Sequence, residues 1–166
     1  MNNYVVAYLD MQNAYQIKFI SAEDPITALR RTIPKFVKVL EYIKTQQLEV
    51  SYENLYTYIS HIDISTFSII QVPELSTASN IRMQILSIYD IAHNTLTLLY
   101  TKKQSQLDAL YSTLTEMYNV EQTDFLLELY NNKDIRGIIM YFSNLTGLRV
   151  YTVSTLRQLV KESIKK

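Results

Sequence analysis

The sequence contains no cysteine, only two glycines and only three prolines among its 166 residues. Without cysteine the chain has no disulfide bonds, no thiolate metal ligands and no cysteine nucleophile. A β-sandwich or β-barrel needs many tight turns, which are rich in glycine and proline, so the shortage of both argues against these folds. The two glycines also cannot build a phosphate-binding loop, which needs several glycines close together.

Long hydrophobic runs are absent as well. No stretch approaches the roughly 18 uncharged apolar residues that a membrane-spanning helix needs. The first ten residues contain no basic residue and only a short apolar run, so they do not match a secretory signal peptide. We therefore expect a soluble, cytoplasmic protein with no membrane partner.

Charge of one sign is not in excess over the whole chain, because sixteen basic residues balance sixteen acidic ones. The balance conceals an asymmetry. Residues 133–166 contain seven basic and two acidic residues, a net charge of +5, so the rest of the chain carries −5. A basic segment on an acidic body indicates an anionic partner for that segment.

What is present predicts an α+β fold that begins with a β-hairpin. Residues 4–9 are β-branched and aromatic, and residues 14–20 alternate apolar with polar, which is typical of strands. Asp24 followed by Pro25 then predicts a helix start. Its apolar stripe continues to Ile43, and Pro34 should kink or split it.

The rest of the chain divides at about residue 74. Residues 55–72 favour one long strand, or a hairpin that turns near Asp63. We therefore predict a small α+β unit over residues 1–74, joined by a linker at 73–76 to a mostly helical region over residues 75–166. Within that region, apolar spacings of three and four predict helices at about 78–101, 107–117 and 122–131, the second with Ser105 as a cap. No internal repeat is visible in the sequence.

The C-terminal segment predicts two short helices around Gly147. Asp134 can cap a helix that ends at Thr146, and Gly147 can adopt the left-handed conformation that closes it, with Leu148 packing back onto its last turn. A second helix is expected from about Tyr151. Together these form a helix-turn-helix pair over residues 134–164. The alternative is that residues 148–154 form a strand, because their β-branched and aromatic side chains suit one.

Residues 139–158 resemble the twenty-residue helix-turn-helix motif of bacterial, phage and archaeal regulators. Ser143 stands where that family has a small residue between the helices, and Gly147 stands in the turn. Thr146 departs from the motif, which usually has an apolar residue there. The expected apolar positions are occupied by Phe142, Leu148, Val153 and Leu156.

The resemblance implies binding of duplex DNA, and a homodimer that reads two half-sites. On the second helix, cations and hydroxyl groups would position phosphates, while Arg149 or Gln158 would reach a base edge. The residues expected to face DNA are Arg149, Tyr151, Ser154, Thr155, Gln158 and Lys161.

The opening of the chain resembles the small accessory proteins of phages and archaeal viruses, through a hairpin followed by residues 22–29 at the start of a helix. Members of that group act by binding DNA or a host protein rather than by catalysis, and would work in the host cytoplasm. The first expectation is a non-enzymatic DNA-binding regulator. The alternative is a protein-binding inhibitor or adaptor, such as an antagonist of host defence, which contacts a host protein or itself and no nucleic acid.

Catalytic chemistry has little support in the sequence, and we expect no enzyme activity, cofactor or metal site. No nucleophile motif is present. The best candidate for a metal site combines two pairs of residues, His61 with Asp63 and Asp90 with His93. The two pairs would have to lie close together in the fold to bind one ion. The fourteen tyrosines fall mostly at core spacings, which indicates packing.

Overall fold

The computed structural model describes residues 1–74, 82–103 and 105–164. The first half contains β1 (Asn2–Asp10), β2 (Tyr15–Ala22), α1 (Pro25–Thr32), α2 (Phe36–Thr45), α3 (Tyr52–Tyr58), the 3₁₀ helix η1 (Ile59–Ile62) and β3 (Ile64–Val72). The second half contains β4 (Gln84–Asp90), β5 (Thr95–Thr101), α5 (Gln106–Ser112), the π-helical turn η2 (Thr113–Met117), α6 (Asp124–Asn131), α7 (Ile135–Thr146), β6 (Leu148–Thr155) and α8 (Leu156–Ile164). The α+β class expected from the sequence is confirmed.

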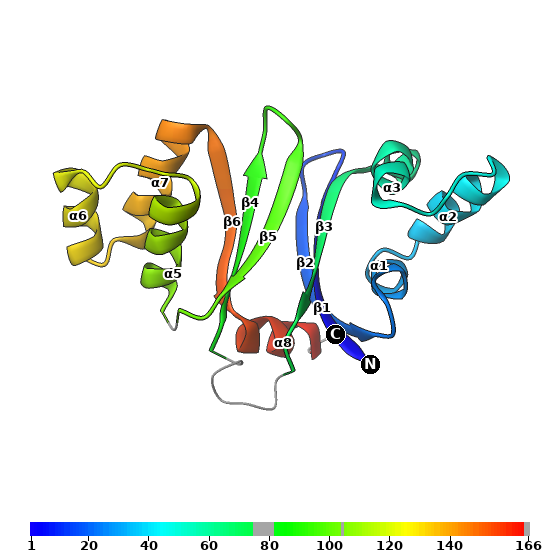
Figure 1. Cartoon of the computed structure of the whole chain (residues 1–166), viewed down its shortest axis with the longest axis horizontal. Helices are drawn as coiled ribbons and strands as arrows, with labels where there is room; N and C mark the ends of the chain where they lie inside the picture. The colour runs from blue at the N-terminus through cyan, green and yellow to red at the C-terminus, as the bar shows by residue number, and fades with distance from the viewer. Residues whose placement is uncertain (75–81, 104, 165–166) are drawn as a thin grey trace.

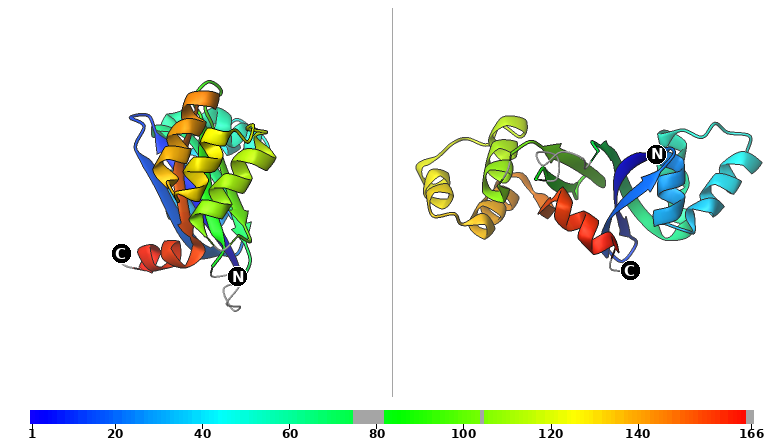
Figure 2. Two further views of the ribbon diagram at one scale, coloured as in Figure 1. Left: turned by 90° about the vertical axis from the view of Figure 1, so that its left-hand side faces the viewer. Right: turned by 90° about the horizontal axis from the view of Figure 1, so that it is seen from below.

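The elements form four layers, with two antiparallel sheets in the middle and helices on both outer sides (Figure 1). One sheet has the order β2-β1-β3 and the other has the order β5-β4-β6. Both halves therefore follow the same plan, a hairpin, then helices, then a third strand that pairs with the first. Helix α8 crosses beneath the two sheets and contacts β2 and β6 (Figure 2).

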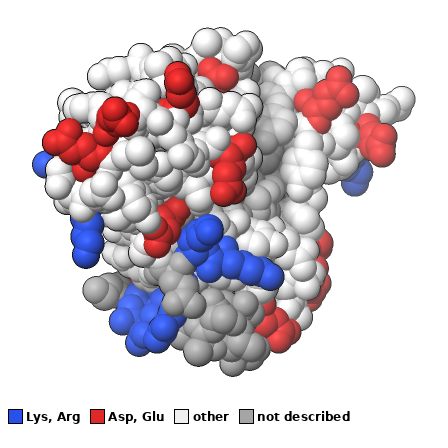
Figure 3. Space-filling view, turned by 60° about the vertical axis from the view of Figure 1, so that its left-hand side comes forward, with Lys and Arg blue, Asp and Glu red and all other residues white. Residues whose placement is uncertain are grey.

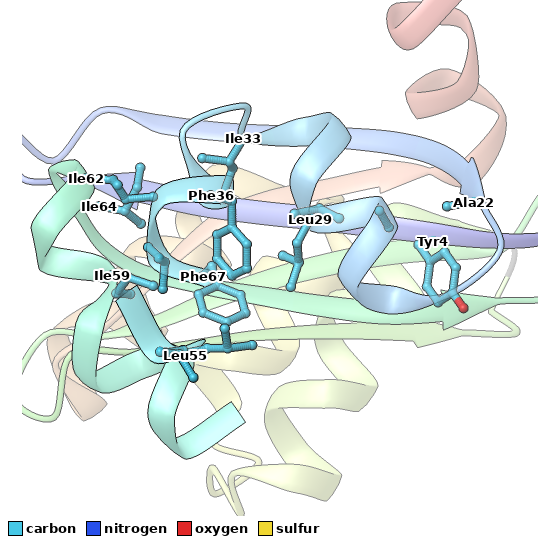
Figure 4. Close-up of a cluster of buried hydrophobic side chains, with 14 residues drawn as sticks. Tyr4, Ala22, Leu29, Ile33, Phe36, Leu55, Ile59, Ile62, Ile64 and Phe67 are labelled. Carbon is cyan, nitrogen blue, oxygen red and sulfur yellow. The ribbon is translucent and has the colours of Figure 1, made fainter. Parts of the chain in front are cut away.

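Each sheet buries one face against its own helices. In the first half, Phe36 and Phe67 meet edge to face with ring centroids 5.8 Å apart, and Leu29, Leu55 and Ile59 surround them (Figure 4). In the second half, Phe142 of α7 and Leu110 of α5 are fully buried in the corresponding cluster. Apolar burial of this extent supplies the driving force that holds the helical layers on the sheets.

The other faces of the two sheets pack against each other. Val5, Leu9 and Ile85 are fully buried in this shared cluster. Side chains bridge the halves at both edges. The Tyr15 hydroxyl lies 2.6 Å from Thr152 Oγ1, and the Leu98 amide donates to Ser68 Oγ at 3.2 Å. The two sheets thus share one core.

Several local expectations are confirmed. The first two strands pair as a hairpin, and Asp24 caps α1 by accepting a hydrogen bond from the Thr27 amide at 2.8 Å. The helix that follows is split at Pro34 into α1 and α2. Gly147 closes α7 at a φ of 75°, and Ser105 caps α5.

One predicted strand and one predicted helix were wrong. Residues 52–62 form α3 and η1, so the expected strand over 55–72 begins only at Ile64. The expected helix at about 78–101 is instead the hairpin of β4 and β5, and its residues 78–81 lie outside the described residues, as do residues 75 and 76 of the expected linker. Strand β4 is buried on both faces, so its apolar residues run together and mimic a helical spacing.

The helix-turn-helix geometry over residues 134–164 was also wrong. Residues 148–155 form β6, which pairs antiparallel with β4 from Leu148 to Thr155, with an irregularity between Ser87 and Ile88. The next helix begins only at Leu156. The strand alternative prevails because β4 is a central strand, and the pairing satisfies the backbone groups on its second edge.

Within the described part of the chain, no helix has the length and apolar character needed to cross a bilayer.

Candidate functional site

The six residues expected to face DNA do not share one helix. Arg149 and Tyr151 lie on β6, where the Arg149 guanidinium carbon is 5.9 Å from the centre of the Tyr151 ring. Tyr151 turns into the space between the sheets and stacks on Tyr15 at 4.6 Å. Ser154 Oγ is buried and has no hydrogen-bond partner among the described residues.

Of the other three residues, Thr155 is the last residue of β6, and Gln158 and Lys161 lie on α8. Thr155 Oγ1 accepts a hydrogen bond from the Gln158 amide at 3.1 Å and so begins the helix. Gln158 and Lys161 are exposed. The structure therefore divides the six residues between a strand and a following helix, and leaves Arg149, Gln158 and Lys161 as the exposed members.

The two histidines are not brought together. Asp90 Oδ2 lies 2.8 Å from His93 Nδ1 in the β4–β5 turn, and this hydrogen bond lowers the pKa of the Asp90 carboxyl. His61 packs instead against the rings of Tyr42 and Tyr58 in the first helical layer. In residues 1–74, 82–103 and 105–164, no group of three or more His, Asp or Glu side chains is placed to hold a metal ion.

An apolar groove lies between α6 and α7 on the outer surface of the second half. Its volume is about 510 Å³. Three large apolar side chains on its rim are more than half exposed, namely Phe125 at 56%, Met140 at 65% and Leu145 at 57%. The groove is lined by Phe125, Leu129, Asp134, Gly137, Met140, Tyr141, Asn144 and Leu145. Exposed apolar side chains grouped in this way are characteristic of a binding surface.

Local packing fixes the shape of this groove. Thr123 caps α6 by accepting from the Leu126 amide, and its hydroxyl lies 3.3 Å from the Tyr141 hydroxyl on α7. A Cβ atom at Gly137 would stand 2.5 Å from Asp134 Oδ2, in the cap of α7, and 2.8 Å from Leu129 Cδ2 on α6, so a larger residue would require both side chains to move. The groove is therefore set by the helices themselves.

The layer that carries the groove is acidic. From Ser105 to Gly147 the chain has six acidic and two basic residues, a net charge of −4. Figure 3 shows Asp and Glu side chains spread over a largely uncharged surface, with Lys and Arg at its left edge and in its lower part. Within the layer, the Tyr130 hydroxyl donates to Asp108 at 2.5 Å, which lowers the pKa of Asp108 and raises that of Tyr130.

The groove was not found by reasoning from the sequence, although a signal for it exists. The core stripe of α7 is formed by Ile135, Ile138, Ile139 and Phe142. Met140 is an apolar residue on the opposite side of this helix, where a polar residue is expected. Its exposure together with that of Phe125 depends on how α6 packs on α7, which spacing along the chain does not show.

Comparison with family models, with curated proteins and with solved structures found no match to this chain.

Proposed function

We propose that the chain is a non-enzymatic protein-binding module, an adaptor or inhibitor, that takes a segment of a partner protein into the α6–α7 groove. The observation that carries this proposal is the cluster of Phe125, Met140 and Leu145, whose large apolar side chains surround the groove while more than half exposed. Covering such side chains with a partner removes apolar surface from water, which favours association.

The arrangement of β6 weakens the case for the alternative, a DNA-binding regulator. A helix-turn-helix reader needs its second helix to be free to enter the major groove. Here residues 148–155, which follow Gly147, pair with β4 in a sheet, and Tyr151 packs against Tyr15. The basic residues Arg149, Arg157 and Lys161 remain exposed, so a duplex is included in the test below.

Selection of peptides from a random library tests the proposal. Peptides should be enriched on the native protein and lost on Met140→Lys, which places a charge in the groove. Met117→Lys is the matched control, because Met117 is 56% exposed and does not line the groove. Peptides that bind all three proteins equally would contradict the proposal.

A parallel titration with a short DNA duplex distinguishes the two functions. The proposal predicts that Met140→Lys leaves duplex binding unchanged and that any binding is weak. Tight binding that falls steeply with added salt and is reduced by Arg149→Ala with Gln158→Ala would support the DNA-binding alternative instead.

A further inference from the structure

We infer that the occupant of the α6–α7 groove is an amphipathic α-helix with basic flanks, supplied by a partner protein. This inference rests on the proposed function and names the chemistry of the partner. Three observations carry it: the backbone that lines the groove, the spacing of its apolar side chains, and the charges around it.

The backbone of the groove favours a helical occupant over an extended one. Both walls are α-helices, whose amides and carbonyls are already hydrogen-bonded within α6 and α7. An extended peptide in this groove would bury its own amides and carbonyls against apolar side chains without partners, and each unpaired group would lower its affinity. A helix satisfies its own backbone, so it can lie on an apolar surface at no such cost.

The side chains of α7 that face the groove have helical spacing. Gly137, Met140, Tyr141, Asn144 and Leu145 recur at intervals of three and four residues and form one strip along the helix. From Gly137 to Leu145 the strip is about 12 Å long, at 1.5 Å per residue. A partner helix would match it with apolar residues at the same intervals over about two turns, and so complete a three-helix bundle with α6 and α7.

The rim of the groove favours basic flanks on that helix. Asp134 lines the groove, and Glu128 lies three residues after Phe125, on the same face of α6. Arg136 and Lys133 supply the two opposing positive charges of this layer. The layer as a whole retains its net charge of −4. Lysine or arginine beside the apolar stripe of the partner would therefore be attracted to it.

Three labelled peptides of one length test the inference by fluorescence anisotropy and circular dichroism. Each is about 18 residues long, enough to form a helix when its apolar face is covered. The first carries leucine at helical spacing among lysines, and the second replaces each lysine with glutamate. The third differs from the first only by a proline at its centre. We expect the first peptide to bind and gain helicity, and the glutamate and proline peptides to bind about tenfold more weakly or not at all.

Variants of the protein test whether the first peptide binds in the α6–α7 groove. Met140→Lys should weaken this binding by about tenfold or more, while Met117→Lys leaves it unchanged. Asp134→Asn and Glu128→Gln should each weaken it about two- to fivefold, and salt should abolish this difference. Asparagine at position 134 can still cap α7, so loss of the fold does not confound that variant.

The outcomes separate this inference from the proposed function. If the glutamate or proline peptide binds as well as the lysine peptide, and Met140→Lys abolishes that binding, the groove is a protein site but its occupant is not a basic helix. If no peptide from the designed set or from the random library depends on Met140, both proposals are overturned. If the protein alone self-associates in a Met140-dependent manner, the occupant is a second copy and the inference is wrong.

Discussion

Gly147 closes α7 in the left-handed conformation, at a φ of 75°, and its amide donates a hydrogen bond to the Ser143 carbonyl at 2.8 Å. Asp24, Ser105 and Asp134 cap helices as expected. Each of these roles depends on neighbours within a few residues, so the sequence alone contains the information.

Gly147→Ala should destabilise the protein by about 1 kcal/mol, because alanine pays for the left-handed conformation that glycine adopts freely. No described heavy atom lies within 4 Å of the position of an added Cβ, so the effect is conformational rather than steric. The measurement is the free energy of unfolding in urea. Gly147→Asn is the control and should lose less, since asparagine tolerates this conformation. An unchanged free energy in the alanine variant would contradict the account.

The Asp24 cap predicts a pH dependence. The Thr27 amide, followed by the Thr27 hydroxyl, holds the pKa of the Asp24 carboxyl below its usual value in the folded protein. A lowered folded pKa stabilises the fold above the unfolded pKa of about 3.9, and this contribution is lost as the pH falls through the folded value. Asp24→Ala should therefore lower the urea midpoint at pH 7, and the gap to the native protein should narrow below about pH 4.

Asp24→Asn serves as the control for that experiment, because asparagine caps the helix without titrating. A gap between the native protein and Asp24→Ala that stays constant from pH 7 to pH 3 would show that the ionised carboxylate is not what stabilises α1.

At the scale of elements, the predictions were correct where the conformation of a segment depends on its own residues, and wrong where it depends on pairing with a distant strand. Helices α1, α2, α6 and α7 have amphipathic patterns with caps or breakers and were predicted. Strand β4 was taken for a helix, and β6 was expected as a helix with a strand as the alternative, because their apolar residues allow either conformation. Their pairing with each other joins residues that are 58 to 71 positions apart, such as Leu86 with Val153, and such long-range pairing leaves no local signal.

Residues 148–155 should show strand-like backbone chemical shifts throughout in solution, because they pair with β4. NMR assignment of this segment measures it directly. The same spectrum gives an internal reference in Ile135–Thr146, which should be helical. Helical shifts from Tyr151 onward would restore the helix-turn-helix interpretation.

The whole molecule was the least predictable scale. The two halves share an order of elements that no sequence repeat reveals, and they bury a common apolar cluster between their sheets. The candidate groove also appears only at this scale, since it requires α6 and α7 to be packed side by side. Phe125 and Met140 lie on one groove because α6 and α7 pack together, and their positions in the chain do not show this.

The shared core predicts one cooperative unfolding transition. Leu9→Ala in the first sheet and Ile85→Ala in the second should each lower the free energy of unfolding by about 2–5 kcal/mol, because both side chains are fully buried between the sheets. Calorimetry should show a single transition in both variants, and Val37→Ala at an exposed site should have little effect. Separate transitions for the two halves would contradict a shared core.

NMR of the five methionine methyl groups can show whether a peptide occupies the proposed docking groove between α6 and α7. Met140 lies on the groove, whereas Met1, Met11, Met83 and Met117 do not line it. On titration with the leucine–lysine peptide, the Met140 signal should shift and the other four signals should remain in place. A shift of Met11 or Met117 with Met140 unmoved would show that the peptide binds elsewhere and would contradict the claim.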